Sequence, residues 1–259
     1  MILSKRTLDI LKNCSDINPS ILFKKGSKIK TISPLKNILF EADVDEVFPC
    51  DFAIYDLATF LSVCRNSMKD ANIDFEEDKL IFRKGIKEYK YYYCEPTLIV
   101  VPHEKGIQNF YPIGCSFYLM KDVLDYLKRS AKTAKFADLV IFGCQESNSI
   151  YAGVRNMDND TSNMVKVKIA NKLESDNWFL EFPERILIVK VDNLKLMRSD
   201  YEVTFADGII HFAPINDSFK YWIALEGCSK YFPQEETKEP EYYSEVEEEE
   251  GETEEEVAS

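Results

Sequence analysis

The chain has 259 residues, of which 45% are hydrophobic and 13% aromatic, so it can bury a sizeable core and is not a disordered chain. Its formal net charge is −13, but residues 233–259 contain thirteen Glu and one Lys, which is −12 and leaves −1 on residues 1–232. The acidic balance therefore does not exclude DNA binding by this nearly neutral body.

Several classes of protein are disfavoured by composition. Apolar runs such as residues 98–101 are far shorter than the roughly 20 residues that span a bilayer, and residues 1–6 lack a signal-peptide segment, so we expect a cytosolic protein without a membrane partner. The seven cysteines form no Cys-x-x-Cys pair, which predicts reduced core thiols. His103 and His211 lie in no ligand motif, so we expect no metal and no cofactor.

The pattern of apolar residues predicts a unit of one strand, one short helix and three strands, repeated four times. In the first unit, Ser4 is a plausible N-cap for a helix that ends near Asn13. In the second, a strand leads into a helix that begins at Asp56 and extends to Met68. The strands expected for these two units are 21–24, 28–32, 38–44, 50–55, 73–76, 79–82 and 88–94.

A connector from Glu95 to Gly114 contains Pro96, Pro102 and Pro112, which predicts an extended, intermittently paired segment. Beyond it, helices are expected at 121–135 and 192–198. The strands expected for the third and fourth units are 139–144, 150–155, 164–169, 186–191, 201–205, 209–212 and 220–225.

Units two and four align with each other. Residues 53–57 parallel residues 189–194, and in both an apolar strand precedes an aspartate, Asp56 or Asp192, that would cap the next helix. A tandem duplication explains this better than chance similarity among alternating strands. The fold class is therefore α+β, with two similar domains. The expected boundaries are 1–95 for the N-terminal domain, 96–114 for the interdomain connector, 115–232 for the C-terminal domain and 233–259 for a disordered acidic tail.

The four expected helices carry basic residues on their polar sides. On any one helix this is most often only a solvated face. If four such helices share one side of the sheets, they form a positive surface suited to phosphate contact without base readout. The candidate DNA-facing residues are Lys5, Lys12, Arg65, Lys69, Lys121, Lys128, Arg129, Lys132, Lys195 and Arg198.

Several stretches resemble one family. They are Leu3-Ser4-Lys5, Leu11-Lys12-Asn13, residues 51–57 with Phe60-Leu61, Val100-Val101-Pro102, Phe110-Tyr111-Pro112 and residues 221–226. Together the chain resembles the sliding clamps of T4-like bacteriophages, which are DNA polymerase processivity factors. The resemblance covers roughly residues 1–230 and is dense only at the two ends; residues 53–57 are its most specific part.

The resemblance implies the DNA-clamp fold, with the helices on one side of antiparallel sheets. It implies a non-enzymatic homotrimeric ring around duplex DNA in the cytoplasm of an infected bacterium. The implied partners are a C-terminal peptide of the replicative polymerase, a clamp-loader ATPase and late-transcription factors. Lys5 and Lys12 match pore-facing lysines of the family, whereas the third helix matches by location only. A partner-peptide pocket is expected at Ile99, Val101, Ile107 and Phe110.

Two other interpretations stay open. An enzyme is disfavoured because no Gly-rich phosphate loop, His-Glu-x-x-His or Gly-x-Ser-x-Gly motif occurs. The second is a clamp-fold interaction adaptor that does not encircle DNA. The acidic tail and the loops at 156–163 and 171–177 depart from the family. The tail is interpreted as a solubilising appendage, a docking segment for a partner or a mimic of nucleic-acid charge.

Overall fold

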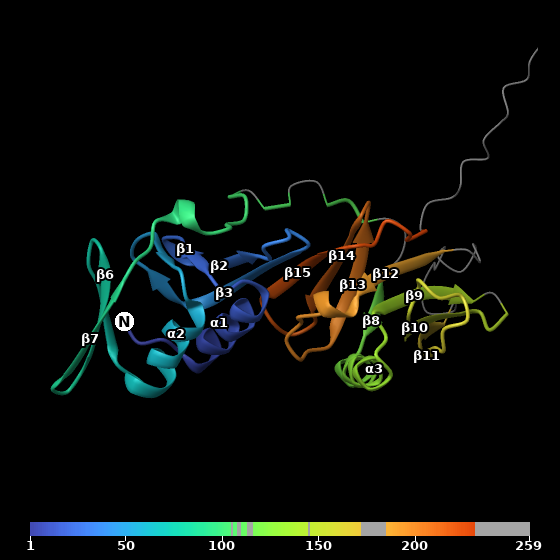
Figure 1. Cartoon of the computed structure of the whole chain (residues 1–259), viewed down its shortest axis with the longest axis horizontal. Helices are drawn as coiled ribbons and strands as arrows, with labels where there is room; N and C mark the ends of the chain where they lie inside the picture. Colours follow the sequence, from blue (N-terminus) through green and yellow to red (C-terminus); the bar gives the residue numbers. More distant parts are fainter. Residues whose placement is uncertain (105, 108–109, 113–115, 145, 172–184, 231–259) are drawn as a thin grey trace, which may run out of the picture.

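The computed structural model describes residues 1–104, 106–107, 110–112, 116–144, 146–171 and 185–230 (Figure 1). Cys115, most of the loop at 171–177 and the tail at 233–259 lie outside the described residues, so the expectations for them stay predictions.

The first two units have the expected order. Ser4 caps the first helix, because its Oγ accepts a hydrogen bond from Thr7 N at 3.1 Å, and Asp56 caps the second by accepting from Thr59 N at 2.9 Å. The second helix ends in a π-helical turn at Val63–Ser67. The elements are α1 Lys5–Ile17, β1 Ile21–Phe23, β2 Gly26–Ile32, β3 Ile38–Phe48, β4 Phe52–Ile54, α2 Leu57–Ser62, β5 Asn72–Phe75, β6 Lys79–Lys84 and β7 Lys87–Tyr92.

The third and fourth units follow the connector, in which Pro96–Leu98 form a 3-10 turn. The third unit begins with a short strand whose bounds were not predicted, and its helix is followed by the C-cap residue Lys135, which adopts the left-handed conformation at φ 55°. The elements are β8 Phe117–Leu119, α3 Lys121–Ala134, β9 Asp138–Cys144, β10 Ser149–Arg155, β11 Val165–Asn171, β12 Ile186–Lys190, β13 Tyr201–Ala206, β14 Ile209–Pro214 and β15 Phe219–Ala224.

All described strand pairs are antiparallel, and three of the four described sheets combine strands of more than one unit. The sheet orders are β1-β4, β5-β6-β7, β11-β10-β9-β12 and β2-β3-β15-β14-β13-β8. Thus β12 of the fourth unit pairs with β9 of the third, and β8 of the third pairs with β13 of the fourth. The first unit has no strand before α1, but Met1 O accepts from Ile73 N at 2.7 Å, so the chain start lies beside β5. The two halves join where β3 pairs with β15.

The helices α1, α2 and α3 lie on one side of the sheets, and the connector crosses the other side (Figure 1). The predicted arrangement of helices on one side of antiparallel sheets is therefore confirmed, whereas the exact domain boundaries stay predictions. Within the described part of the chain, no helix is both long enough and apolar enough to cross a membrane.

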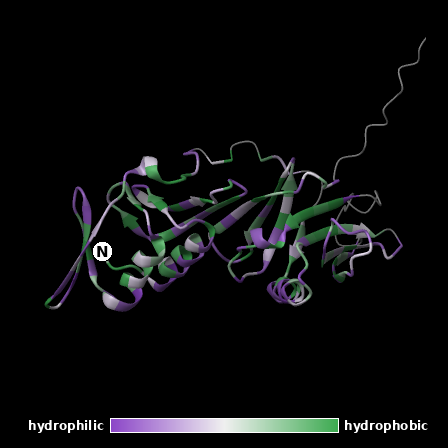
Figure 2. Ribbon diagram, in the orientation of Figure 1, coloured by the Kyte–Doolittle hydropathy of each residue, from purple (hydrophilic) through white to green (hydrophobic). Residues whose placement is uncertain are grey.

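The core lies between the helices and the sheets. Ile10, Leu11, Leu127 and Ala131 are almost completely buried under the sheets, and each fully buried large aliphatic side chain contributes about 1.5–3 kcal/mol. Where the halves meet, the rings of Phe40 and Tyr221 are 4.7 Å apart. In Figure 2 polar colouring gathers on the β6–β7 hairpin and the outer side of α3, while the strands above α3 are mostly hydrophobic.

The prediction of a fourth helix at 192–198 is wrong. Only Val191–Asn193 form a single 3-10 turn, and Asp192 caps no helix. The main chain that follows bonds to side chains instead: Asn13 Nδ2 donates to Lys195 O at 2.7 Å, and Lys128 Nζ donates to Leu194 O at 2.8 Å. Met197 N donates to the Tyr221 hydroxyl at 3.1 Å. Because these groups already have partners, the segment needs no helical hydrogen bonds.

Candidate nucleic-acid interface

Helix α1 presents Lys5 and Lys12 to solvent, opposite the buried Ile10 and Leu11. Lys12 makes an exposed ion pair with Asp16, four residues on. Among the described residues, Lys5 has no ion-pair partner. An exposed i,i+4 pair is weak and screened by salt, so Lys12 stays available to a phosphate.

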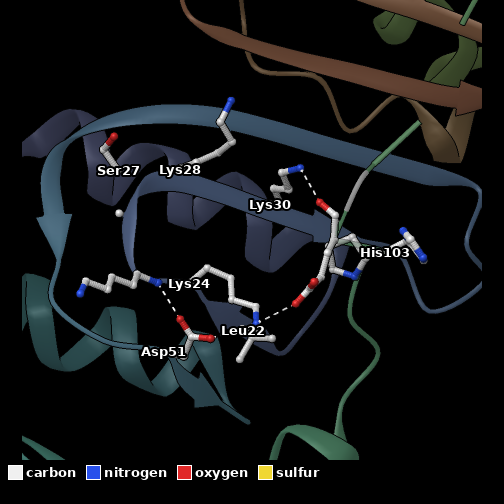
Figure 3. A pocket seen from close by; sticks show the side chains of 11 residues that line it. Leu22, Lys24, Ser27, Lys28, Lys30, Asp51 and His103 are labelled. Carbon is white, nitrogen blue, oxygen red and sulfur yellow. Dashed lines mark hydrogen bonds and ion pairs between the residues drawn. The ribbon is translucent and has the colours of Figure 1, made fainter. Parts of the chain in front are cut away.

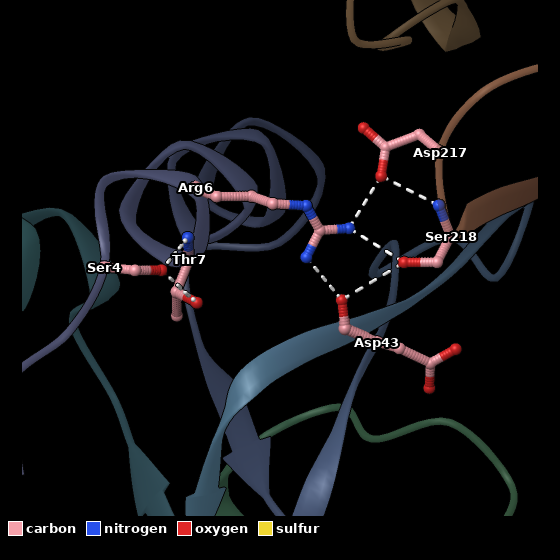
Figure 4. Close-up of polar contacts among 6 residues, drawn as sticks. All are labelled: Ser4, Arg6, Thr7, Asp43, Asp217 and Ser218. Carbon is pink, nitrogen blue, oxygen red and sulfur yellow. Dashed lines mark hydrogen bonds and ion pairs between the residues drawn. The ribbon is translucent and has the colours of Figure 1, made fainter.

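Arg6, on the same helix, has a structural role (Figure 4). Its guanidinium donates to Asp43 O at 2.6 Å, to Asp217 Oδ1 at 2.6 Å and to Ser218 Oγ at 2.8 Å. These contacts join α1 to β3 and to the turn between β14 and β15, where the two halves of the chain meet. Arg6 is therefore committed to fixing α1 against the sheet.

The second helix contributes two of the predicted residues. Arg65 donates to Leu8 O at 2.8 Å and to Asp9 Oδ1 at 2.9 Å, so it holds the π-helical turn against α1. Lys69, just beyond that turn, is exposed. Arg65 is thus paired with Asp9, whereas Lys69 makes no ion pair among the described residues.

Helix α3 divides its basic residues in the same way. Lys128 is half-buried and donates to Leu194 O at 2.8 Å, and desolvation by burial lowers the pKa of its ammonium group, an effect that Asp125 opposes. Lys121 lies 3.7 Å from Asp200. Arg129 and Lys132 are exposed and have no ion pair among the residues that the structure describes.

Neither of the two residues predicted for the fourth helix, Lys195 and Arg198, lies on a helix. Arg198 donates to Asp122 and Asp125 of α3, at 2.8 Å each, so its charge is neutralised by the neighbouring helix. Lys195 is half-buried on the irregular segment after Asn193. We define the helical face as the exposed residues Lys5, Lys12, Lys69, Arg129 and Lys132, half of the predicted set.

The connector residues expected to form a peptide pocket are spread out. Ile99 and Ile107 are half-buried, Val101 is exposed, and the Phe110 ring lies 5.2 Å from His211, which in turn lies 5.1 Å from Trp222. A cavity of about 380 Å³ does adjoin the connector, but none of these four residues lines it. Their assignment to a peptide pocket stays a prediction.

That cavity is the feature the sequence reasoning missed (Figure 3). Its walls come from Leu22 of β1, from β2 and the turn before it, with four lysines at positions 24, 25, 28 and 30, and from Pro102, His103 and Glu104 of the connector. The signal was present as a run of lysines around Gly26, but it lay outside the helices. Among the described residues, no group of three or more His, Cys, Asp or Glu side chains could hold a metal ion.

Comparison with known proteins gives relatives of one kind. The family model described as DNA polymerase processivity factor matches residues 4–100. The sliding clamp of Vibrio phage KVP40 is 26% identical over 229 residues, which cover 87% of this chain and 99% of that protein. The sliding clamp of Enterobacteria phage T4 is 26% identical over 236 residues, covering 89% of this chain and 99% of that protein.

Solved structures share the fold. The DNA polymerase III subunit beta of Pseudomonas aeruginosa is similar with a TM-score of 0.56 and 12% identity over 88% of this chain, which spans 64% of the bacterial subunit. The A. fulgidus PCNA, solved with the C-terminal region of FEN-1, is similar with a TM-score of 0.58 and 12% identity, covering 88% of this chain and 98% of that one. The relatives and the shared fold therefore agree: the chain is similar in sequence to the sliding clamps of T4-like phages, its residues 4–100 match the DNA polymerase processivity factor family, and it has the sliding-clamp fold.

Proposed function

We propose that the chain forms a head-to-tail homotrimeric ring around duplex DNA. The observation that carries the proposal is the pairing of strands between units. The last strand of unit one, β3, pairs antiparallel with the last strand of unit four, β15. The last strands of the other two units, β7 and β11, are each at the edge of a sheet.

The edge strands β7 and β11 lie at opposite ends of the molecule (Figure 1). If β7 of one copy paired with β11 of the next as β3 pairs with β15, the sheets would continue from subunit to subunit. Such a contact joins two different surfaces, and it closes into a ring when the rotation per copy allows. It would also cover two strand edges that otherwise invite uncontrolled pairing.

In such a ring the helical face would line the pore. Its exposed lysines are flexible point charges that contact phosphates without fixed geometry, so the ring could slide. Topological closure would supply retention, and tethering would raise the local concentration of template at the polymerase. This is the physical basis of processivity, and it needs no catalytic residue.

The proposed partners are a C-terminal peptide of the replicative polymerase, a clamp-loader ATPase and late-transcription factors, in the cytoplasm of the infected bacterium. Support for peptide partners comes from proteins of the same fold. The A. fulgidus PCNA binds the C-terminal region of FEN-1, and the Helicobacter pylori beta clamp binds a DNA ligase peptide. The alternative is a clamp-fold adaptor that does not encircle DNA.

The first test is the mass of the protein in solution, which distinguishes a trimeric ring from an adaptor that stays monomeric. We expect light scattering to give about 90 kDa, three chains of 30.0 kDa, across a concentration series. A monomer that persists at the highest concentration, with and without DNA and a loader, would contradict the ring and favour the adaptor.

DNA contact is tested by the variant Lys5→Glu/Lys132→Glu. Because both side chains are exposed, we expect the fold and the trimer to survive while binding to duplex DNA weakens. The slope of log affinity against log salt should become shallower by about 0.9 for each phosphate that the variant protein no longer neutralises. Processive synthesis with polymerase and loader should fall in parallel.

The matched control is Lys25→Glu/Lys36→Glu, which makes the same charge change at two exposed turn residues that are not part of the helical face. We expect this control to keep the salt slope and processivity of the unmodified protein. Equal losses in the two variants would mean that net charge, and not the helical face, governs DNA contact.

A further inference from the structure

The cavity beside the connector has the chemistry of a site for an acidic segment. We call it the lysine pocket and define it by Lys24, Lys25, Lys28 and Lys30, which come from β2 and the turn before it (Figure 3). Leu22 and Pro102 supply apolar wall, and Asp51 and Glu104 are its two carboxylates. Residues 102–104 of the connector line the pocket, and the connector crosses the side of the sheets opposite α1, α2 and α3 (Figure 1).

The connector residue Glu104 already contacts two of these lysines. Lys24 Nζ lies 3.2 Å from Glu104 Oε1, and Lys30 Nζ donates to the main-chain oxygen of Glu104 at 3.3 Å. A glutamate side chain and a peptide carbonyl are thus already held by two of the lysines. The Glu104 side chain is 81% exposed, so its ion pair is weak and another carboxylate can replace it.

The other charges leave room for further carboxylates. Lys24 also contacts Asp51 at 2.9 Å, Lys28 contacts Asp43 at 3.3 Å, and Lys30 contacts Glu41 at 2.8 Å. Among the described residues, the exposed side chain of Lys25 has no ion pair. Each ammonium group has three donors, so Lys28, which holds one carboxylate, can hold a second, while Lys25 can bind a carboxylate with all three of its donors.

The chain carries its own candidate occupant. Residues 245–256 contain nine Glu and no Lys or Arg. They follow Lys230, which pairs with Ile186 at the start of β12. From Lys230 these residues are 15 to 26 positions along the chain, a reach of roughly 50–90 Å when extended.

We propose that this acidic segment, residues 245–256, binds in the lysine pocket. The segment acts as a tethered competitor: an acidic stretch of a partner that approaches the connector must first displace it. Its local concentration is high because it belongs to the same assembly, so weak exposed ion pairs suffice to hold it. The proposal does not depend on ring closure.

The direct test is zero-length carbodiimide crosslinking of the full-length protein, followed by mass spectrometry. This reagent joins a lysine to a carboxylate only where they touch. We expect crosslinks from residues 245–256 to concentrate on Lys24, Lys25, Lys28 and Lys30, and to disappear as salt is raised. The same crosslinks spread evenly over exposed lysines would overturn the proposal.

Two charge-reversal variants sharpen the test. Lys25→Glu/Lys28→Glu changes exposed side chains of the pocket, and Lys5→Glu/Lys132→Glu makes the same charge change on the helical face. A labelled peptide of residues 234–259 is titrated onto protein whose tail glutamates are replaced by glutamine. We expect the pocket variant to bind it about tenfold more weakly, an effect of about 1.4 kcal/mol, and the helical-face variant to bind as before.

The opposite result would mean that the tail covers the helical face and mimics DNA, which overturns the proposal. Equal weakening in both variants would show unspecific attraction and also overturn it. Circular dichroism and thermal unfolding of each variant establish that the fold is retained. If the pocket variant unfolds, Lys25→Gln/Lys28→Gln replaces it, with the same two outcomes.

Discussion

At the scale of single residues, Asp56 and Asp192 show how one sequence pattern has two outcomes. Both aspartates follow an apolar strand at equivalent positions of units two and four. Asp56 caps α2 by accepting from Thr59 N and from Thr59 Oγ1 at 2.6 Å, whereas Asp192 lies within a three-residue 3-10 turn. The same residue type therefore stabilises a helix in one unit only.

We predict that Asp56→Ala lowers the free energy of unfolding by about 1 kcal/mol, the usual cost of losing an N-cap. The hydrogen bonds from Thr59 hold the pKa of Asp56 below its ordinary value. Its stabilisation is therefore complete above a pH of about 4, the pKa of an unfolded aspartate, and is lost as the pH falls through the lower folded pKa. Urea unfolding at neutral and acid pH measures both effects.

The matched control is Asp192→Ala, which we expect to change stability by less than about 0.5 kcal/mol. An equal loss for the two aspartates would show that the Asp56 cap contributes nothing specific.

At the scale of elements, hydrogen bonds from neighbouring elements hold the segment after Asn193 in place. The Tyr221 hydroxyl, from β15, donates to Asn13 Oδ1 of α1 at 2.7 Å and accepts from Met197 N. Asn13 in turn donates to Lys195 O. One buried hydroxyl thus links a helix of the first half to a strand and a loop of the second.

We predict that Tyr221→Phe lowers the free energy of unfolding by about 1–3 kcal/mol, because it leaves a buried amide oxygen and a main-chain N–H without a partner. The urea midpoint should fall while the m-value stays the same. Tyr118→Phe removes a hydroxyl from an exposed tyrosine and should change stability little. Equal stability of the Tyr221→Phe and unmodified proteins would mean that water replaces the missing hydroxyl.

At the scale of the whole molecule, the edge strands β7 and β11 are the contacts on which the proposed ring depends. Tyr93 N donates to Asp78 O across to β6 at 3.0 Å. Alternate residues of a strand direct their main-chain groups to opposite sides, so those of Lys90 point away from β6, toward the open edge. Proline is tolerated at such a position, but it removes the outward donor.

We predict that Lys90→Pro converts the proposed trimer of about 90 kDa into a monomer of 30.0 kDa, with little loss of secondary structure. Light scattering and circular dichroism make the two measurements. Lys90→Ala keeps the N–H and removes the same charge, so it should remain trimeric. A trimeric Lys90→Pro protein would exclude β7 as the subunit contact.

Much of the fold could be predicted from the sequence. The helices at 121–135 and from Asp56 and the strands around Ile150 and Ile209 follow from apolar spacing and caps, and the structure confirms them. The candidate interface could be predicted only in part. Lysines such as Lys5 and Lys132 are exposed as expected, but Arg198 lies between two aspartates of a neighbouring helix, and no local pattern reports such a partner.

The sequence by itself determined the order of units, the sides of α1 and α3 that face the core, and the similarity to phage sliding clamps, because each depends on residues close together along the chain. Only the tertiary structure decided that the fourth helix is replaced by an irregular segment, that Lys128 and Arg198 are bound within the protein, and that four lysines of β2 and its preceding turn line one cavity with the connector. Each of these outcomes depends on a hydrogen bond or charge from a distant part of the chain, and such a partner overrides a local preference of a few tenths of a kcal/mol per residue.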